Sequence, residues 1–232
     1  MCDRYSFTLS KEKTIRRFGV QLKQVLPLNF NFAPGMGIPA ITQDFPMEIS
    51  LLHWGMDIPQ IKDKNKLKQV QNISITSFTP QSYWQSLLVA NRCIIPADGF
   101  YLCKRVSKKG KVPYRVVLKW NLPFAIAGIW NINKYDESQK DCVVLTTPTN
   151  TALQHIAGYM PAILPLEYEK AWLHQTLSTE EAIKLLQCYP PENMKVYPVS
   201  SQLLHANENS ELLTKPSQPT DQFGNYILFE DH

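Results

Sequence analysis

Cys2 is the residue whose position offers the most unusual chemistry. Removal of Met1 leaves an N-terminal cysteine, which carries a thiol and a free α-amine on adjacent carbons. An α-amine titrates near a pKa of about 7.7–8.0 and a free thiol near about 8.5, so both nucleophiles are partly deprotonated close to neutral pH. Such a 1,2-aminothiol captures an aldehyde by forming an imine, adding the thiolate and closing a five-membered thiazolidine ring. This chemistry requires no cofactor, and we expect none.

The remaining cysteines do not suggest a metal site or a disulfide framework. Five cysteines are an odd number, with no C-x-x-C pair and no Cys/His cluster at zinc spacing. We therefore expect reduced thiols and no metal. No apolar run approaches the ~18 residues of a membrane span, and the N-terminus lacks the apolar core of a secretory signal. These features predict a cytoplasmic protein without a membrane partner, and we expect a monomer.

The charge pattern is compatible with a nucleic-acid partner. Lys and Arg outnumber Asp and Glu by 24 to 20, which gives a net charge of +4. Two clusters stand out, and each is as typical of a solvated loop or hairpin tip as of a polyanion-binding surface. They consist of Lys62, Lys64, Lys66 and Lys68, and of Lys104, Arg105, Lys108, Lys109 and Lys111.

Hydrophobic periodicity indicates which elements position Cys2. Alternation over Arg4–Phe7 predicts a strand that begins just after it, and Ser10 and Gly19 bound a short helix. Further helices are expected at 80–90, from Thr149-Asn150 towards Ile156, at 167–174 and at 178–187, the last with the capping-box pair Ser178 and Glu181. Strands are expected at 30–34, 38–41, 49–54, 93–96, 100–103, 114–118, 124–129, 142–145 and 160–164.

These elements predict an α+β fold in which helices wrap a curved antiparallel, barrel-like sheet. With 232 residues and no internal repeat or compositional break, the chain reads as a single domain with a core over about residues 2–212. Residues 201–225 are rich in Ser, Asn, Gln and Pro and are expected to run over the surface. Tyr226–Phe229 could add an edge strand.

Several segments together resemble the SRAP family of abasic-site processing proteins. The most specific is Arg92–Tyr101, which resembles the family pattern R-C-[LI]-[IV]-P-A-[DN]-G-[FY]-[YF]. The others, in the family's order, are Met1-Cys2-Asp3-Arg4-Tyr5, Asn31-Phe32-Ala33-Pro34, Trp54-Gly55-Met56, Asn72, Leu145-Thr146-Thr147 and Met160-Pro161-Ala162-Ile163-Leu164.

The resemblance implies that Cys2, after loss of Met1, attacks the ring-opened sugar aldehyde of an abasic site in single-stranded DNA and forms a thiazolidine crosslink. It also implies that the Asn72 amide orients the sugar or the α-amine. An asparagine that only makes a turn is the simpler reading of that position. A salt-sensitive DNA groove is expected around Arg4, with Trp54 as a stacking platform and the Lys62–Lys68 stretch, that is Lys62, Lys64, Lys66 and Lys68, on the phosphates.

The departures from the family pattern affect its acid–base groups. Leu102 stands where the family has a glutamate, and Ala157 stands where it has a histidine that aids ring opening and reversal. His155 and Asp3 are the candidate substitutes, although His155 would point away from the site if a helix carried both it and Ala157. Ser74 replaces a phosphate-gripping arginine. Loss of the glutamate should slow the reaction without abolishing it.

Two other functions fit parts of this pattern. A non-catalytic paralogue could keep the fold and bind single-stranded DNA without forming an adduct, since several expected polar groups are missing. An N-terminal-cysteine hydrolase or autoproteolytic peptidase could use the α-amine of Cys2 as base for its own thiol. The Arg92–Tyr101 segment argues against the hydrolase, and the survival of Cys2 with Asn72 argues against the inert paralogue.

Overall fold

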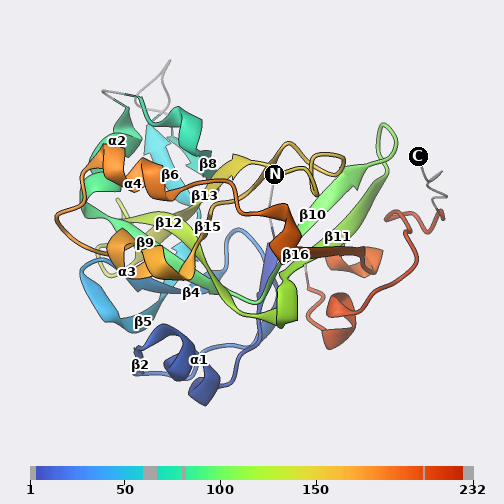
Figure 1. Ribbon diagram of the computed structural model, residues 1–232, viewed down its shortest axis with the longest axis horizontal. Coiled ribbons are helices and arrows are strands. Elements are labelled where there is room, and N and C mark those ends of the chain that lie inside the picture. The colour runs from blue at the N-terminus through green and yellow to red at the C-terminus, as the bar shows by residue number, and fades with distance from the viewer. Residues whose placement is uncertain (1–3, 60–66, 80–81, 206, 227–232) are drawn as a thin grey trace.

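The structure of the protein, a computed structural model, describes residues 4–59, 67–79, 82–205 and 207–226. Its strands form two large sheets that meet around a shared apolar core (Figure 1). Tyr5 and Phe100 enter that core from one sheet, and Ile38 and Trp130 enter it from the other. One continuous core therefore holds the N-terminal strand against the rest of the molecule.

The smaller sheet contains the N-terminal strand β1 in its interior. Its order is β16 (Met194–Pro198), β11 (Lys111–Leu118), β10 (Gly99–Arg105), β1 (Arg4–Phe7) and β3 (Asn29–Phe32). β1 is antiparallel to both neighbours, with Arg4 opposite Tyr101 and Tyr5 opposite Phe32. The predicted strand at Arg4–Phe7 is confirmed.

The larger sheet closes on itself. β13 pairs in parallel with β5 while the path from β13 through β12, β9 and β4 returns to β5, which gives the barrel-like core. The predicted α+β fold with a curved, barrel-like sheet is confirmed, but this closure by parallel pairing was not expected. The strands are β2 (Gln21–Leu22), β4 (Gly37–Thr42), β5 (Phe45–Trp54), β8 (Asn72–Ser74), β9 (Arg92–Ala97), β12 (Phe124–Ile132), β13 (Lys140–Pro148), β14 (Tyr159–Pro161) and β15 (Ile163–Leu164), and β6 (Met56–Pro59) pairs separately with β7 (Leu67–Val70).

Helices cover the outside of the barrel. The Ser10 hydroxyl caps α1 (Lys11–Phe18) and Gly19 ends it at φ 66°, while Ser178 and Glu181 form the expected capping box of α4 (Thr179–Leu185). The other elements are α2 (Tyr83–Ala90), α3 (Glu169–Trp172), and the 3₁₀ turns η1 (Ile75–Ser77), η2 (Lys119–Asn121), η3 (Leu166–Tyr168), η4 (Pro191–Asn193), η5 (Ser201–Leu204) and η6 (Glu211–Thr214). None of the helices in the described part of the chain is long and apolar enough to span a membrane.

The helix expected from Thr149-Asn150 towards Ile156 is absent, and turns occupy residues 151–156. The Asn150 side chain fixes these turns, because its amide oxygen accepts from the Ala152 N–H and its amide nitrogen donates to the Tyr189 carbonyl. Such side-chain bonds to backbone compete with regular helix. The chain after Asn150 is therefore held in a compact loop that leads into β14.

Arg92 opens the segment that carries the strongest family resemblance, and it is a structural anchor. Its side chain is fully buried, and its guanidinium donates to the carbonyls of Leu88, Trp172 and His174, each at 2.6 Å. These bonds tie β9 to α2 and to the α3 segment. The fixed fork of arginine donors suits several carbonyls at once, which explains why this position needs that side chain.

The C-terminal segment runs along the outer face of the smaller sheet, at the right of Figure 1. It was expected only to cross the surface, but Val199, Leu203 and Leu213 are fully buried and pack around Tyr101 of β10. Of the expected strand at Tyr226–Phe229, only Tyr226 lies within the described residues, where it forms an isolated bridge with Thr220.

Candidate functional site

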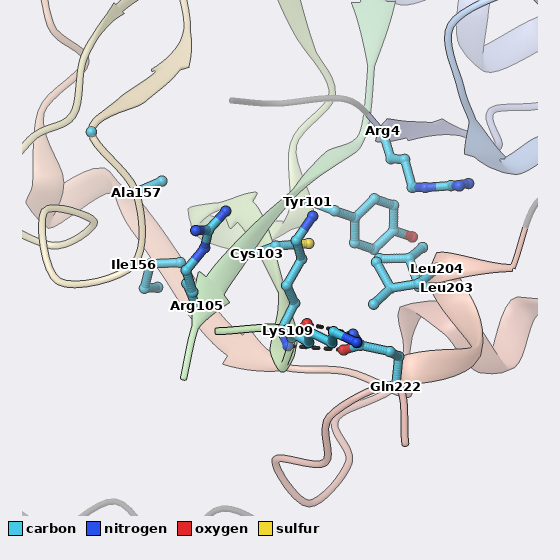
Figure 2. Close-up of a pocket in the computed structure, with 12 residues that line it drawn as sticks. Arg4, Tyr101, Cys103, Arg105, Lys109, Ile156, Ala157, Leu203, Leu204 and Gln222 are labelled. Carbon is cyan, nitrogen blue, oxygen red and sulfur yellow. Dashed lines mark hydrogen bonds between the residues drawn. The ribbon is translucent and has the colours of Figure 1, made fainter. Parts of the chain in front are cut away.

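A cavity of about 710 Å³ opens beside Arg4, the first described residue of β1. Figure 2 shows Tyr101, Cys103 and Arg105 of β10 between the turn that precedes β14 and the C-terminal segment. The cavity therefore lies beside the first described pair of β1 and β10, Arg4 and Tyr101. Its other lining residues are Lys109, Lys111, Ile156, Ala157, Gly158, Leu203, Leu204 and Gln222.

The alternation of β10 determines which of its residues reach this cavity. Successive side chains of a strand point to opposite faces. Phe100 and Leu102 enter the apolar core and are fully buried, whereas Tyr101, Cys103 and Arg105 line the cavity. The position of the family's glutamate, at Leu102, is thus filled by an apolar side chain packed in the core.

A buried polar network fixes β1 and Thr8 against the turn between β9 and β10. The Asp98 carboxylate accepts from the Ser6 hydroxyl at 2.5 Å and from both the N–H and the hydroxyl of Thr8 at 2.6 Å. Arg115 donates to the same carboxylate at 3.2 Å and to the Ser6 hydroxyl at 3.0 Å. A Cβ on Gly99 would lie 2.6 Å from the Arg115 guanidinium, so only glycine leaves this arrangement undisturbed.

The cavity is strongly cationic. Arg4, Arg105, Lys109 and Lys111 line it, and its described lining residues include no aspartate or glutamate. Arg4 is oriented by a 2.9 Å hydrogen bond to the Asn31 side chain. Four positive side chains gathered in one cavity create a potential that attracts a polyanion.

Tyr101 contributes a neutral, fixed wall to the cavity. Its hydroxyl donates to the Phe30 carbonyl at 2.8 Å, and burial raises its pKa to about 12. Tyr101 therefore stays protonated at neutral pH. Cys103 beside it is half-buried and is not part of a disulfide, as is also true of Cys93, Cys142 and Cys188.

The two residues expected to do chemistry next to Arg4, Cys2 and Asp3, lie outside the described residues. Asn72 is half-buried at the start of β8, opposite Val144 of β13, and does not line the cavity. The expected pairing of Cys2 with Asn72 stays a prediction.

His155 does not reach the cavity. It is exposed in the turn segment, while its neighbours Ile156 and Ala157 line the wall. The Ala157 backbone is fixed there, because its N–H donates to the Leu153 carbonyl at 3.1 Å and its carbonyl accepts from the Thr149 hydroxyl at 2.8 Å. His155 is therefore wrongly placed to replace a group at Ala157, and Ala157 leaves that wall without a titratable side chain.

Trp54 cannot serve as a base-stacking platform, so that prediction is wrong. Only 1% of its surface is exposed, its ring lies 5.6 Å from that of Tyr5, and its indole N–H donates to the Gln71 carbonyl. Lys68 is exposed on β7 but does not line the cavity, and Lys62, Lys64 and Lys66 lie outside the described residues.

The residues missing from the sequence-based list of DNA contacts are Arg105, Lys109 and Lys111. The cluster was visible in the sequence, but nothing there separated a solvated hairpin tip from a cavity wall. The pairing of Arg105 with Lys111 across β10 and β11 was the available signal, because residues directly opposite in an antiparallel pair share one face.

The family of the chain follows from comparison with known proteins. Residues 1–206 match the family described as SOS response associated peptidase, SRAP. The chain belongs to the SRAP family.

Relatives within the SRAP family match nearly the whole chain. The abasic site processing protein YoqW of Bacillus subtilis is 32% identical over 220 residues, which cover 90% of this chain and 97% of YoqW. The abasic site processing protein YedK of Escherichia coli is 24% identical over 226 residues, which cover 92% of this chain and 99% of YedK. A solved structure from Bacteroides thetaiotaomicron has the same fold, with a TM-score of 0.79 at 22% identity over 93% of this chain and all of that one.

The described residues contain no group of three or more His, Cys, Asp or Glu side chains that could hold a metal ion. The side chains that line the described part of the cavity are cations, a phenol, a thiol, the carboxamide of Gln222 and apolar groups.

Proposed function

We propose that this SRAP protein captures abasic sites in single-stranded DNA as a covalent thiazolidine adduct of Cys2. The observation that carries the proposal is the cationic cavity beside Arg4, whose described lining residues include no aspartate or glutamate. YoqW and YedK, which match almost the full chain, are named abasic site processing proteins. We also propose that the protein acts as a monomer in the cytoplasm.

Covalent geometry limits how far the nucleophile can be from this cavity. Two residues of fully extended chain span at most about 7 Å, so Cys2 lies within that distance of Arg4. The network around Asp98 anchors Ser6 and Thr8, which fixes the strand from which Cys2 extends. A reacting aldehyde held at the Arg4 end of the cavity would meet both nucleophiles of Cys2.

The reaction balances without a cofactor. The α-amine of Cys2 adds to the aldehyde carbon of the ring-opened sugar, and loss of one water molecule gives an imine. The Cys2 sulfur then adds to the same carbon, and the thiol proton ends on the ring nitrogen. The product is a thiazolidine, and the only by-product is water.

The residues of the cavity would contribute mainly binding and orientation. Arg4 and the other cations neutralise backbone phosphates. Neither Leu102 nor Ala157 can move a proton, so the ~10²–10⁴-fold contribution of a general acid or base is reduced. Proximity of two nucleophiles to a bound aldehyde supplies a larger factor, so the adduct forms slowly rather than not at all.

A non-catalytic DNA-binding protein is the second candidate. The observation in its favour is the same pair of replacements, because Leu102 and Ala157 remove both acid–base groups of the family pattern while the cationic cavity remains. A hydrolase or autoproteolytic peptidase acting through Cys2 is the third possibility, and a peptide product would identify it.

The decisive experiment incubates the purified protein with a single-stranded oligonucleotide that bears one abasic site. A denaturing gel and intact-mass measurement should show an adduct equal to the sum of the two masses minus one water. Cys2→Ala should abolish it, Cys103→Ala should retain most of it, and a tetrahydrofuran analogue lacking the aldehyde should give none. Binding without an adduct would establish the non-catalytic candidate, and an adduct that depends on Cys103 would overturn the assignment of the nucleophile.

A further inference from the structure

The tip of the β10–β11 hairpin places three cations at the end of the cavity away from Arg4. Arg105 and Lys111 face each other across the hairpin, and Lys109 belongs to the turn between the strands. All three are exposed and line the cavity, and none of them forms an ion pair within the described part of the chain. No carboxylate in the part of the chain that the structure describes therefore neutralises their charge.

A segment beyond the family match holds this tip in place. Gln222, which also lines the cavity, donates through its side-chain amide to the Lys109 carbonyl at 2.7 Å, and its amide oxygen accepts from the Lys111 N–H at 2.8 Å (Figure 2). The SRAP match ends at residue 206. The two hydrogen bonds of Gln222, called the clamp below, are thus made by a residue that the family match does not include.

The clamp is itself rigid. Asp221 is only 5% exposed, and its carboxylate accepts from the backbone N–H groups of Phe223 and Asn225, both at 2.9 Å. A Cβ on Gly110 would meet the Ser107 hydroxyl at 2.7 Å and the Asp221 carboxylate at 3.1 Å, so hairpin tip and clamp are closely packed. These contacts hold the hairpin tip in one position, as a wall of the cavity.

We infer that Arg105, Lys109 and Lys111 form a phosphate-binding arm for the nucleic-acid strand that occupies the cavity, with Gln222 as the positioning residue of that arm. This inference rests on the proposed function and adds where the strand continues beyond Arg4. Unpaired cations bind backbone phosphates by releasing counterions, which makes binding independent of base sequence and steeply dependent on salt.

The test measures binding rather than adduct formation. Cys2→Ala protein is titrated with an unmodified single-stranded oligonucleotide at several salt concentrations, so that no covalent step contributes. Each lost phosphate contact lowers the slope of log K against log salt by about 0.7 for a single strand. The triple variant Arg105→Gln, Lys109→Gln, Lys111→Gln should therefore lose about 2 from the slope, and on the order of 100-fold in affinity at 0.1 M salt.

The matched control removes the same charge from a different surface. Lys11→Gln, Lys13→Gln, Arg16→Gln changes three exposed cations of α1, which do not line the cavity. This variant should keep the wild-type slope within experimental error. An equal loss in both triple variants, no loss in the hairpin variant, or no measurable binding by the Cys2→Ala parent would overturn the inference.

Gln222→Met tests the positioning role without a change of charge. The variant keeps the side-chain length but removes both hydrogen bonds to the hairpin tip, and it should lower affinity roughly three- to tenfold and flatten the salt slope. If Gln222 has only a structural role, the variant should have a lower melting temperature and an unchanged salt slope. That result would refute the positioning role of Gln222. Absence of a Cys2 adduct with these slope changes intact would refute only the proposed function, and a normal adduct with unchanged slopes would refute only this inference.

Discussion

Asp98→Asn should weaken both the fold and the placement of the nucleophile. The carboxylate of Asp98 accepts four hydrogen bonds, two from Thr8 and one each from Ser6 and Arg115. An asparagine amide has one acceptor oxygen in place of two. Whichever way the amide is oriented, its nitrogen faces donors, either the two of Thr8 or those of Ser6 and Arg115.

The magnitude follows from burial. Asp98 and Arg115 are only 9% and 8% exposed. The donors that face the amide nitrogen, and the guanidinium that loses the carboxylate charge, therefore cannot bond to water instead. Breaking a buried charged pair costs about 3–5 kcal/mol of unfolding free energy. For a chain of this size, about 2–4 °C of melting temperature corresponds to each kcal/mol, so the variant should melt roughly 6–20 °C lower.

The assay combines thermal unfolding, at one scan rate for all variants, with single-turnover adduct formation at a temperature where every variant is folded. Loosening of β1 should slow adduct formation at least tenfold, because small displacements of a reacting group cost about that much or more. Glu137→Gln, the same chemical change in an exposed loop, is the control and should stay within about 0.5 kcal/mol of wild type. A melting temperature of Asp98→Asn within 2 °C of that control would refute this account of the network, the ~2 °C being less than 1 kcal/mol.

Four further outcomes are expected. Arg92→Met should lower the free energy of unfolding by about 4 kcal/mol in urea titration, because several buried carbonyls lose their donor. Leu102→Glu should cost about 3 kcal/mol in the same titration, because it places a carboxyl group in the apolar core. Ala157→His, on the cavity wall, should leave stability nearly unchanged and speed reversal of the adduct about tenfold or more, measured by chase with excess abasic oligonucleotide. Burial raises the pKa of the Cys93 and Cys142 thiols, so the stability they confer is complete below the unfolded thiol pKa and is lost as pH rises towards the folded value. Between pH 8 and 10 the two thiols together should lower the free energy of unfolding by about 4 kcal/mol. The double variant Cys93→Ala, Cys142→Ala should remove that pH dependence.

The elements that could be predicted from sequence are those with local signals. Ser10 and Gly19 delimit α1, and Ser178 with Glu181 starts α4, because capping depends on residues within one turn. The turns after Asn150 were missed because the Tyr189 carbonyl, which accepts from its side chain, lies 39 residues away. Parallel closure of the barrel by β13 and β5 is likewise a long-range pairing without a local pattern.

The cations of the candidate site could be read from the sequence, but the cavity that they line could not. The cationic hairpin cluster and Arg4 were visible in the sequence, yet their convergence depends on the register of β1, β10 and β11. Trp54 illustrates the opposite error. Its large aromatic ring serves equally well in a core and on a nucleic-acid surface, and only the packing against Tyr5 decides between them.

The interior position of β1 in its sheet has a consequence for biosynthesis. β1 is the first strand to leave the ribosome, but Arg4 pairs with Tyr101, about 100 residues later, which takes about 5–20 s at common rates of translation. β3 becomes available soon after β1, but until β10 emerges β1 has a neighbour on one edge only and is not yet an interior strand. If Met1 is removed from Cys2, as the proposed function requires, the interval before β10 encloses β1 is a period in which enzymes that act on nascent chains can reach the N-terminus.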